Sequence, residues 1–390
     1  MNDQRRSPGL IVAGSVAQQP LLGGLGWVFV HLASGLKRLG WDVTFVDRLE
    51  PEMYLDPSGR TAETPSFNVR YFTRLMSAFG VERYSLLGPD GQALAGVDRR
   101  SLLRTARDAV AVIDVMGYLA DPEILERAGH RVFFDIDPGF WHMWCENGSG
   151  VRFGDHDAYV TIGENIGRPG CDIPTCGVEW VTTPQPIVLS EWEPSPRSDG
   201  AFTSVASWRG PYGPIEHAGK TYGLRVHEFR KFVSLPQRTD ERFELALDID
   251  PADVRDRDAL ESNGWGLADP ISEAGDPWRY REYIRRSKGE FMVAKNIYVD
   301  TRSGWFSDRS LCYLASGKPV LAQDTGFPDH YPTGEGLLAY STLEEAVEGI
   351  EEIAADYERH SRAARAIAEE FFDSDKVLSR LLGRLGIDKP

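Results

Sequence analysis

The sequence lacks several features that mark whole classes of protein. No run of about 18 apolar residues is present, so we expect no membrane span. The segment from Met1 to Gly9 also lacks the apolar run of a signal peptide. Four cysteines in 390 residues are too few to build a disulfide scaffold. These absences predict a cytoplasmic protein whose thiols are reduced.

Basic residues are scarce as well. Lysine and arginine number 43 against 59 aspartates and glutamates, which leaves a net charge of −16. Proteins that bind nucleic acid in general present a basic surface to its phosphates, so we expect no such partner. A local basic pocket for one small anion is still compatible with this total.

What the chain does contain is enough apolar material for a sizeable core. Hydrophobic residues make up 42% of the sequence and aromatic residues 11%, which excludes a disordered or fibrous chain. Since a domain usually takes about 100–200 residues, the length of 390 residues predicts two domains.

The first 46 residues predict a strand–helix–strand unit. A short apolar run at residues 10–13 is followed by the glycine pair Gly23-Gly24. Residues 25–39 then place apolar side chains at intervals of three and four, which is typical of a helix with one buried face, and Gly40 suits its end. A second apolar run occupies residues 43–46. Two strands joined by a helix in this way are parallel.

The same alternation continues along the chain and predicts an α/β fold. A proline cluster around residues 184–200 interrupts the pattern, because proline resists both helices and central strands. We therefore expect two facing, doubly wound, Rossmann-like domains over residues 1–190 and 191–372, followed by a helix over residues 373–390; the resemblance described below implies that this helix packs back on the first domain. Ligands of such sheets bind outside the carboxyl ends of the strands, here in the cleft between the domains. Further strands are expected at 111–115, 132–134, 158–162, 201–206, 243–247, 291–294, 319–322 and 337–340, and helices at 226–233, 278–286, 307–316 and from 343 onward.

The stretch from residue 304 to residue 326 has the strongest signals for a ligand. Ser307 suits the N-cap of a helix and Asp308 its first turn. A diphosphate at this helix start would gain from free backbone amides and from the guanidinium of Arg309. The alternative is a capped structural helix with Arg309 at the surface.

These motifs, taken in order, resemble the signatures of GT-B glycosyltransferases. The glycine pair and the helix that ends at Gly40 resemble the N-terminal signature, and residues 314–320 with Asp324-Thr325-Gly326 resemble the C-terminal donor-site signature. The resemblance spans both domains. It departs from many retaining members at Gly304 and Cys312, where those members carry a pair of glutamates.

The resemblance implies a nucleotide-diphosphate sugar as donor, held mainly by the C-terminal domain. The acceptor, a small molecule or a glycan, is then held mainly by the N-terminal domain, and no metal or other cofactor is expected. A cation beside the diphosphate would neutralise the leaving group as the glycosidic bond breaks. The donor-binding residues predicted are Gly23, Gly24, Arg209, Lys220, Lys295, Ser307, Asp308, Arg309, Asp324, Thr325 and Gly326.

A general base is expected on the acceptor side. Asp135 and Asp137 follow the strand predicted at 132–134, so either carboxylate could accept the proton of an acceptor hydroxyl. Asp-x-Asp-Pro-Gly is also a good turn sequence in which aspartate bonds the backbone. His31 is a second candidate base, although its place on a helix also suits a structural histidine. For stacking on the acceptor we predict Phe140, Trp141 and Trp144.

The sequence therefore predicts a glycosyltransferase. The alternatives are a sugar-nucleotide epimerase of the same fold and a non-catalytic protein that binds nucleotide sugars. An NAD-dependent enzyme is disfavoured because no G-x-G-x-x-G fingerprint follows the first strand. Cys171 and Cys176 do not have the spacing of a zinc site, and we predict no metal.

Overall fold

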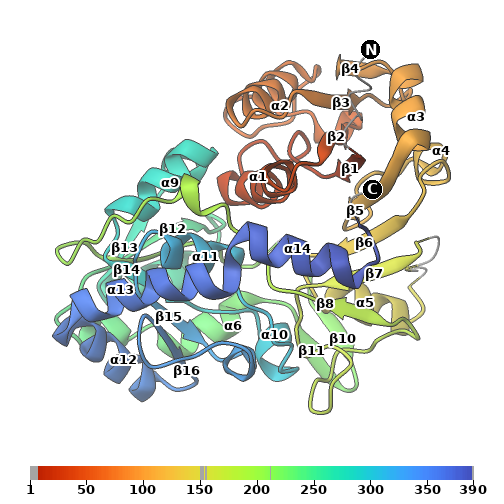
Figure 1. The fold of residues 1–390 in the computed structure, drawn as a ribbon. Helices are drawn as coiled ribbons and strands as arrows, with labels where there is room; N and C mark the ends of the chain where they lie inside the picture. The colour runs from red at the N-terminus through yellow and green to blue at the C-terminus, as the bar shows by residue number, and fades with distance from the viewer. Residues whose placement is uncertain (1–7, 150–152, 154–155, 211, 389–390) are drawn as a thin grey trace.

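The computed structural model describes residues 8–149, 153, 156–210 and 212–388. Two of the segments discussed above are therefore described only in part, because residues 1–7 of the N-terminal segment and residues 389–390 of the last predicted helix lie outside the described residues. The described strands form two large sheets and one small hairpin, and helices cover the sheets (Figure 1). This arrangement confirms the predicted α/β fold class with two Rossmann-like domains.

The first domain is built on an eight-stranded sheet of the described residues, in the order β4-β3-β2-β1-β5-β6-β7-β8. All neighbours in it are parallel except β3 and β4. Its strands are β1 (Gly9–Ala13), β2 (Asp42–Arg48), β3 (Arg83–Leu87), β4 (Ala93–Gly96), β5 (Ala109–Val115), β6 (Arg131–Asp135), β7 (Ala158–Thr161) and β8 (Trp180–Thr182). Its helices are α1 (Gly23–Arg38), α2 (Ser66–Ala78), α3 (Arg99–Asp108), α4 (Pro122–Leu125) and α5 (Phe140–Glu146).

Alternate residues of β1 divide the core of this domain between the two faces of the sheet. Leu10 and Val12 pack with side chains of α1 and α2, whereas Ile11 and Ala13 pack with Leu102 of α3. Successive side chains of a strand point to opposite faces, so a continuous apolar run covers both helix layers. This packing is why the apolar run at residues 10–13 identifies a central parallel strand.

The second domain is built on a six-stranded parallel sheet of the described residues, in the order β13-β12-β9-β14-β15-β16. Its strands are β9 (Phe202–Ser207), β12 (Phe243–Asp248), β13 (Trp265–Ala268), β14 (Gly289–Met292), β15 (Val320–Gln323) and β16 (Leu337–Tyr340). Its helices are α6 (Arg225–Phe229), α7 (Val254–Ser262), α8 (Pro270–Ala274), α9 (Pro277–Arg286), α10 (Asn296–Asp300), α11 (Asp308–Ala315), α12 (Leu343–Ala355) and α13 (Tyr357–Ile367). The strand order reverses at β9, and ligands of doubly wound sheets bind at such a point.

The C-terminal helix α14 (Ser374–Arg384) returns to the first domain, as expected (Figure 1). Arg38 of α1 forms an ion pair with Asp375 at 2.9 Å. Gly35 of α1 faces Leu378, so that a Cβ at residue 35 would lie 2.6 Å from the leucine side chain. The close approach of α1 and α14 therefore depends on a glycine.

Two local features differ from the sequence-based expectation. The first helix begins at Gly23, so the glycine pair forms its first turn rather than the preceding loop. An antiparallel hairpin of β10 (Ile215–His217) and β11 (Lys220–Tyr222) also follows β9, where no strand is expected from the sequence. None of the helices in the described residues combines the length and the hydrophobicity that a membrane span requires.

Candidate active-site cleft

A cleft lies between the loop that follows β1 and the carboxyl ends of β9 and β12. The described residues form three adjoining cavities in this cleft, and Leu22 lines all of them. We call them the Asp137 cavity, of about 460 Å³, the glycine cavity, of about 230 Å³, and the Arg257 cavity, of about 720 Å³. Because they share lining residues, they form one groove between the two domains.

The Asp137 cavity brings together polar side chains from both domains. Five residues of the predicted site line it: Asp137, Lys295, Ser307, Asp308 and Arg309. The first domain also contributes Gln19, Tyr118 and Gln185, and the second contributes Tyr212, Arg225 and Tyr298. Positions that are 158 residues apart in the chain thus meet across the cleft.

Arg225 is the most unusual of these side chains. It is 9% exposed and lines both the Asp137 cavity and the glycine cavity. Its Nη1 donates to the carbonyl of Ser207 at 3.0 Å, but its Nε has no hydrogen-bond partner within the described part of the chain. Within the described residues no carboxylate lies at ion-pair distance from it, and burial lowers its pKa to about 10. A buried cation that no described carboxylate contacts directly is costly, so Arg225 is a ready binding group for an anion.

Lys295 and Asp137 form an ion pair across the cleft. The Nζ of Lys295 lies 3.1 Å from one carboxylate oxygen of Asp137 and 3.2 Å from the other, and the Tyr298 hydroxyl donates to the same carboxylate. Burial lowers the pKa of Lys295, and the charge of Asp137 opposes that shift. The second domain therefore holds Asp137 through two side chains, that of Lys295 just before α10 and that of Tyr298 within it.

The start of α11 faces the same groove. The Ser307 hydroxyl accepts from the backbone N–H of Arg309 at 3.2 Å, which is the N-cap that the sequence predicts. Asp308 lines the Asp137 cavity and the glycine cavity, and burial raises the pKa of its carboxyl. The guanidinium of Arg309 is turned inward, since it donates to Glu290 and to the carbonyl of Val205. Arg309 thus has fewer free donors than a surface arginine at this position would have.

Gly23 and Gly24 line the glycine cavity, where α1 meets α8 and α9. A Cβ on Gly23 would lie 2.4 Å from the backbone oxygens of Ala274 and Asp276. A Cβ on Gly24 would lie 3.0 Å from the ring of Tyr280. Only glycine permits this contact, so the pair sets how closely the first turn of α1 approaches the second domain.

Several predicted donor residues lie outside the lining of the three cavities. Arg209 is 53% exposed and pairs with Asp253, to which its Nε donates at 2.9 Å. Lys220 is exposed on the β10–β11 hairpin. The turn of residues 324–326 bonds internally and to Asn165, whose side chain donates to the Gly326 carbonyl at 3.3 Å. Arg209 and Lys220 are thus not among the residues that line these cavities, and Arg209 is instead paired with Asp253.

The two other candidate bases also lie outside the groove, and their contacts are structural. Asp135 is fully buried, accepts from the Thr161 hydroxyl at 2.7 Å and lies 3.2 Å from Nε2 of His142. His31 is buried beside Trp192, whose indole donates to its Nε2 at 3.0 Å, and burial lowers the pKa of His31 to about 3. Neither side chain is free to accept a proton from a ligand in the cleft.

The three aromatic residues predicted for the acceptor pack against protein. Phe140 is buried, with its ring 4.9 Å from that of Tyr212. Trp144 packs on the same tyrosine at 5.2 Å, and Trp141 packs on Phe133 at 6.2 Å, in each case between ring centroids. In the described structure Tyr212, rather than these three, lines the Asp137 cavity.

Comparison with known proteins agrees with this architecture. No family model and no curated protein matches the sequence. Solved structures do match. The glycosyltransferase from Rickettsia africae ESF-5 superposes with a TM-score of 0.54 at 10% identity, over 97% of this chain and 98% of that one. HepE from Anabaena, solved with UDP, gives 0.54 at 12% identity over 97% and 99%. AviGT4, a glycosyltransferase of avilamycin A biosynthesis, gives 0.54 at 13% identity over 97% and 96%.

The chain has the GT-B fold. Both domains are included, because each superposition covers nearly the whole of both chains. The groove lined by Asp137, Arg225 and Lys295 accordingly lies between the two halves of a GT-B structure. No group of three or more histidine, cysteine or acidic residues in the described segments is arranged to hold a metal ion.

Proposed function

We propose that this protein transfers a sugar from a nucleotide-diphosphate sugar to an acceptor hydroxyl. The observation that carries the proposal is the convergence of two buried cations, Arg225 and Lys295, on an interdomain groove beside the start of α11. A diphosphate is the anion that such a site suits, because two cations and free helix amides can share its charge. The HepE structures with UDP and with UDP-glucose support this choice of ligand.

The donor would lie along the second domain. Its diphosphate would occupy the boundary of the Asp137 and glycine cavities, where Arg225, Asp308 and Arg309 line both. Its nucleoside would extend past Asp248 toward the Arg257 cavity, where Leu247 and Leu267 give an apolar wall suited to a base. The diphosphate would need no metal ion along this path, because the protein itself supplies the cations.

Asp137 is the carboxylate that the first domain presents to the same cavity, and we assign it the role of general base. In the structure its negative charge is balanced by Lys295. A bound diphosphate competes for that ammonium, so donor binding would release Asp137 from its ion pair. The acceptor oxygen then attacks the anomeric carbon, the bond from that carbon to the diphosphate oxygen breaks, and the acceptor proton passes to Asp137.

A thermal-shift screen with UDP, GDP, dTDP and their glucose conjugates tests donor binding. A ligand at 100 times its Kd should stabilise the protein by about 2.7 kcal/mol. Release of nucleoside diphosphate is then measured with and without pools of small-molecule and glycan acceptors. A transferase binds a donor and releases more nucleoside diphosphate when its acceptor is present. An epimerase would yield an isomerised nucleotide sugar without any acceptor, and a binding protein would show no turnover. The absence of a shift with every nucleotide would contradict the proposal.

A further inference from the structure

A second basic cavity lies on the first domain, outside the interdomain groove. It has a volume of about 440 Å³ and is formed by α3, the residues just after α4 and the turn between β3 and β4. Its described lining contains five arginines and no carboxylate. The residues are Gln92, Arg99, Arg100, Leu103, Arg104, Arg107 and Arg127. We call it the arginine cavity.

The arrangement of charge on α3 is unfavourable to the isolated helix. Arg100, Arg104 and Arg107 follow one another at intervals of four and three residues, so they share one face, and all three are exposed. Like charges at this spacing destabilise a helix. The opposite face is buried through Leu102 and Ala106. The chain has a net charge of −16, so three arginines on one helix face form a local concentration of positive charge that its overall composition does not predict.

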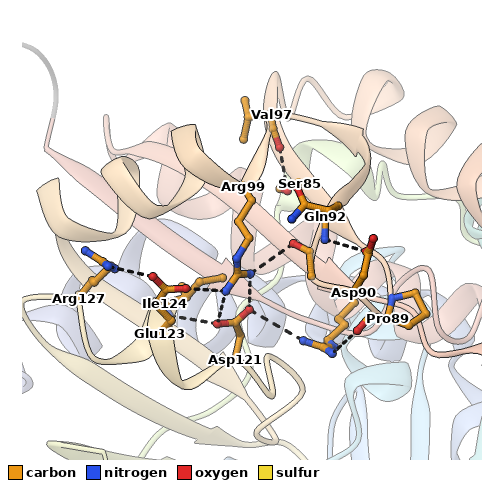
Figure 2. Close-up of polar contacts among 12 residues, drawn as sticks. Ser85, Pro89, Asp90, Gln92, Val97, Arg99, Asp121, Glu123, Ile124 and Arg127 are labelled. Atoms are coloured by element: carbon orange, nitrogen blue, oxygen red, sulfur yellow. Dashed lines mark hydrogen bonds and ion pairs between the residues drawn. The ribbon is translucent and has the colours of Figure 1, made fainter.

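One wall of the arginine cavity is held rigidly by carboxylates behind it. Arg99 donates to Asp121 at 2.7 Å and to Glu123 at 2.9 Å, and Arg127 donates to the other oxygen of Glu123 at 2.9 Å. Figure 2 shows Glu123 between the two guanidinium groups. Arg99 is only 21% exposed, so this wall is ordered by its own protein partners.

On the exposed face of α3, Arg107 pairs with the neighbouring Asp108 at 3.0 Å, whereas Arg100 and Arg104 lack such partners among the described residues. In the described part of the chain, no carboxylate lies within ion-pair distance of Arg100 or Arg104, and the one side-chain hydrogen bond of Arg104 goes to the Ser101 hydroxyl at 3.0 Å. Guanidinium groups with free N–H donors bind phosphate oxygens in pairs, which gives both charge neutralisation and geometry. The unpaired wall is thus the part of the cavity that faces a ligand.

We propose that the arginine cavity binds a phosphate-bearing ligand through Arg100 and Arg104. The same phosphate chemistry is available from the headgroup of an anionic lipid and from a soluble polyphosphate. None of the residues that line the arginine cavity lines the groove, so this proposal does not depend on the proposed transferase activity.

The test uses two probes and two matched variants of the full chain. The probes are inorganic tripolyphosphate, titrated by calorimetry at low salt, and sedimented phosphatidylcholine vesicles with or without phosphatidylglycerol. Arg100→Gln/Arg104→Gln removes two charges from the cavity. Arg255→Gln/Arg362→Gln removes two charges from exposed positions on α7 and α13. Thermal unfolding of both variants confirms that they are folded.

The wild type should bind at least one probe. Each lost guanidinium should weaken binding about tenfold, so the cavity variant should bind about a hundredfold more weakly while the control variant is unchanged. Binding of tripolyphosphate identifies a soluble source of phosphate, and binding of the phosphatidylglycerol vesicles alone identifies a lipid. Failure of the wild type to bind either probe, or an equal loss in the two variants, overturns the proposal. Nucleotide binding in the groove should be the same in all three proteins, which separates this outcome from that of the transferase assay.

Discussion

Arg225 offers the sharpest test of the groove, because its removal should affect the free and the donor-bound protein in opposite directions. Replacement by methionine keeps an unbranched apolar side chain and removes the charge. In the free protein Arg225 is buried with an unbonded Nε and no ion-pair partner among the described residues, and its one hydrogen bond goes to Ser207. We therefore expect Arg225→Met to be as stable as the wild type or more stable, since replacing an uncompensated buried charge by an apolar group is often favourable.

Donor binding should instead be weakened. A hydrogen bond to a charged group contributes about 1.5–3 kcal/mol, so loss of the guanidinium should raise the Kd for the nucleoside diphosphate by about 10- to 150-fold. Calorimetric titration measures this change directly. Arg209→Met is the matched control, because Arg209 also follows β9 but is exposed and paired with Asp253. Equal affinities of Arg225→Met and the wild type, together with weaker binding by Arg209→Met, would refute the assignment.

Three further predictions concern the walls of the groove and the domain junction. Gly23→Ala should lower the free energy of unfolding by about 1–3 kcal/mol and weaken nucleotide binding, because its Cβ meets backbone oxygens at 2.4 Å. Gly383→Ala is the control in denaturant titrations, because its added Cβ would meet no atom of the described residues within 4 Å. His31 has its pKa lowered by burial to about 3, so the unfolded chain binds a proton below about pH 6.5 that the folded chain does not. The contribution of His31 to the free energy of unfolding should therefore fall by about 1.4 kcal/mol for each pH unit as the pH decreases from 6.5 toward 3. This part of the pH dependence should be absent in His31→Gln. An identical slope in the variant would exclude His31 as its source. Asp137→Asn should bind the donor at least as tightly as the wild type, because Lys295 no longer has to leave an ion pair, but it should release nucleoside diphosphate about 10²- to 10⁴-fold more slowly. An unchanged rate would remove Asp137 from the chemistry.

The fold was accessible from the sequence because its signals are local. An apolar run such as residues 10–13 is typical of a strand that is buried on both faces, and Gly40 marks the end of the first helix with its positive φ of 84°. The return of α14 to the first domain came from the resemblance to other GT-B chains rather than from any local pattern.

The choice among cations and carboxylates depends on contacts that are distant in the sequence. Arg209 and Arg225 both follow β9, but Asp253 from the start of α7 holds the first at the surface, and no described carboxylate holds the second. Asp135 and Asp137 are two residues apart, yet Thr161 and His142 bind the first inside the domain while the second reaches the cleft. The composition and spacing of neighbouring residues do not distinguish the members of either pair.

A crystal structure with the nucleoside diphosphate that gives the largest thermal shift would decide where the donor binds. We predict its diphosphate within hydrogen-bond distance of Arg225 and Lys295 at the start of α11, with the Lys295–Asp137 ion pair broken. A diphosphate bound elsewhere, with that ion pair still intact, would contradict the assignment of the interdomain groove as the donor site.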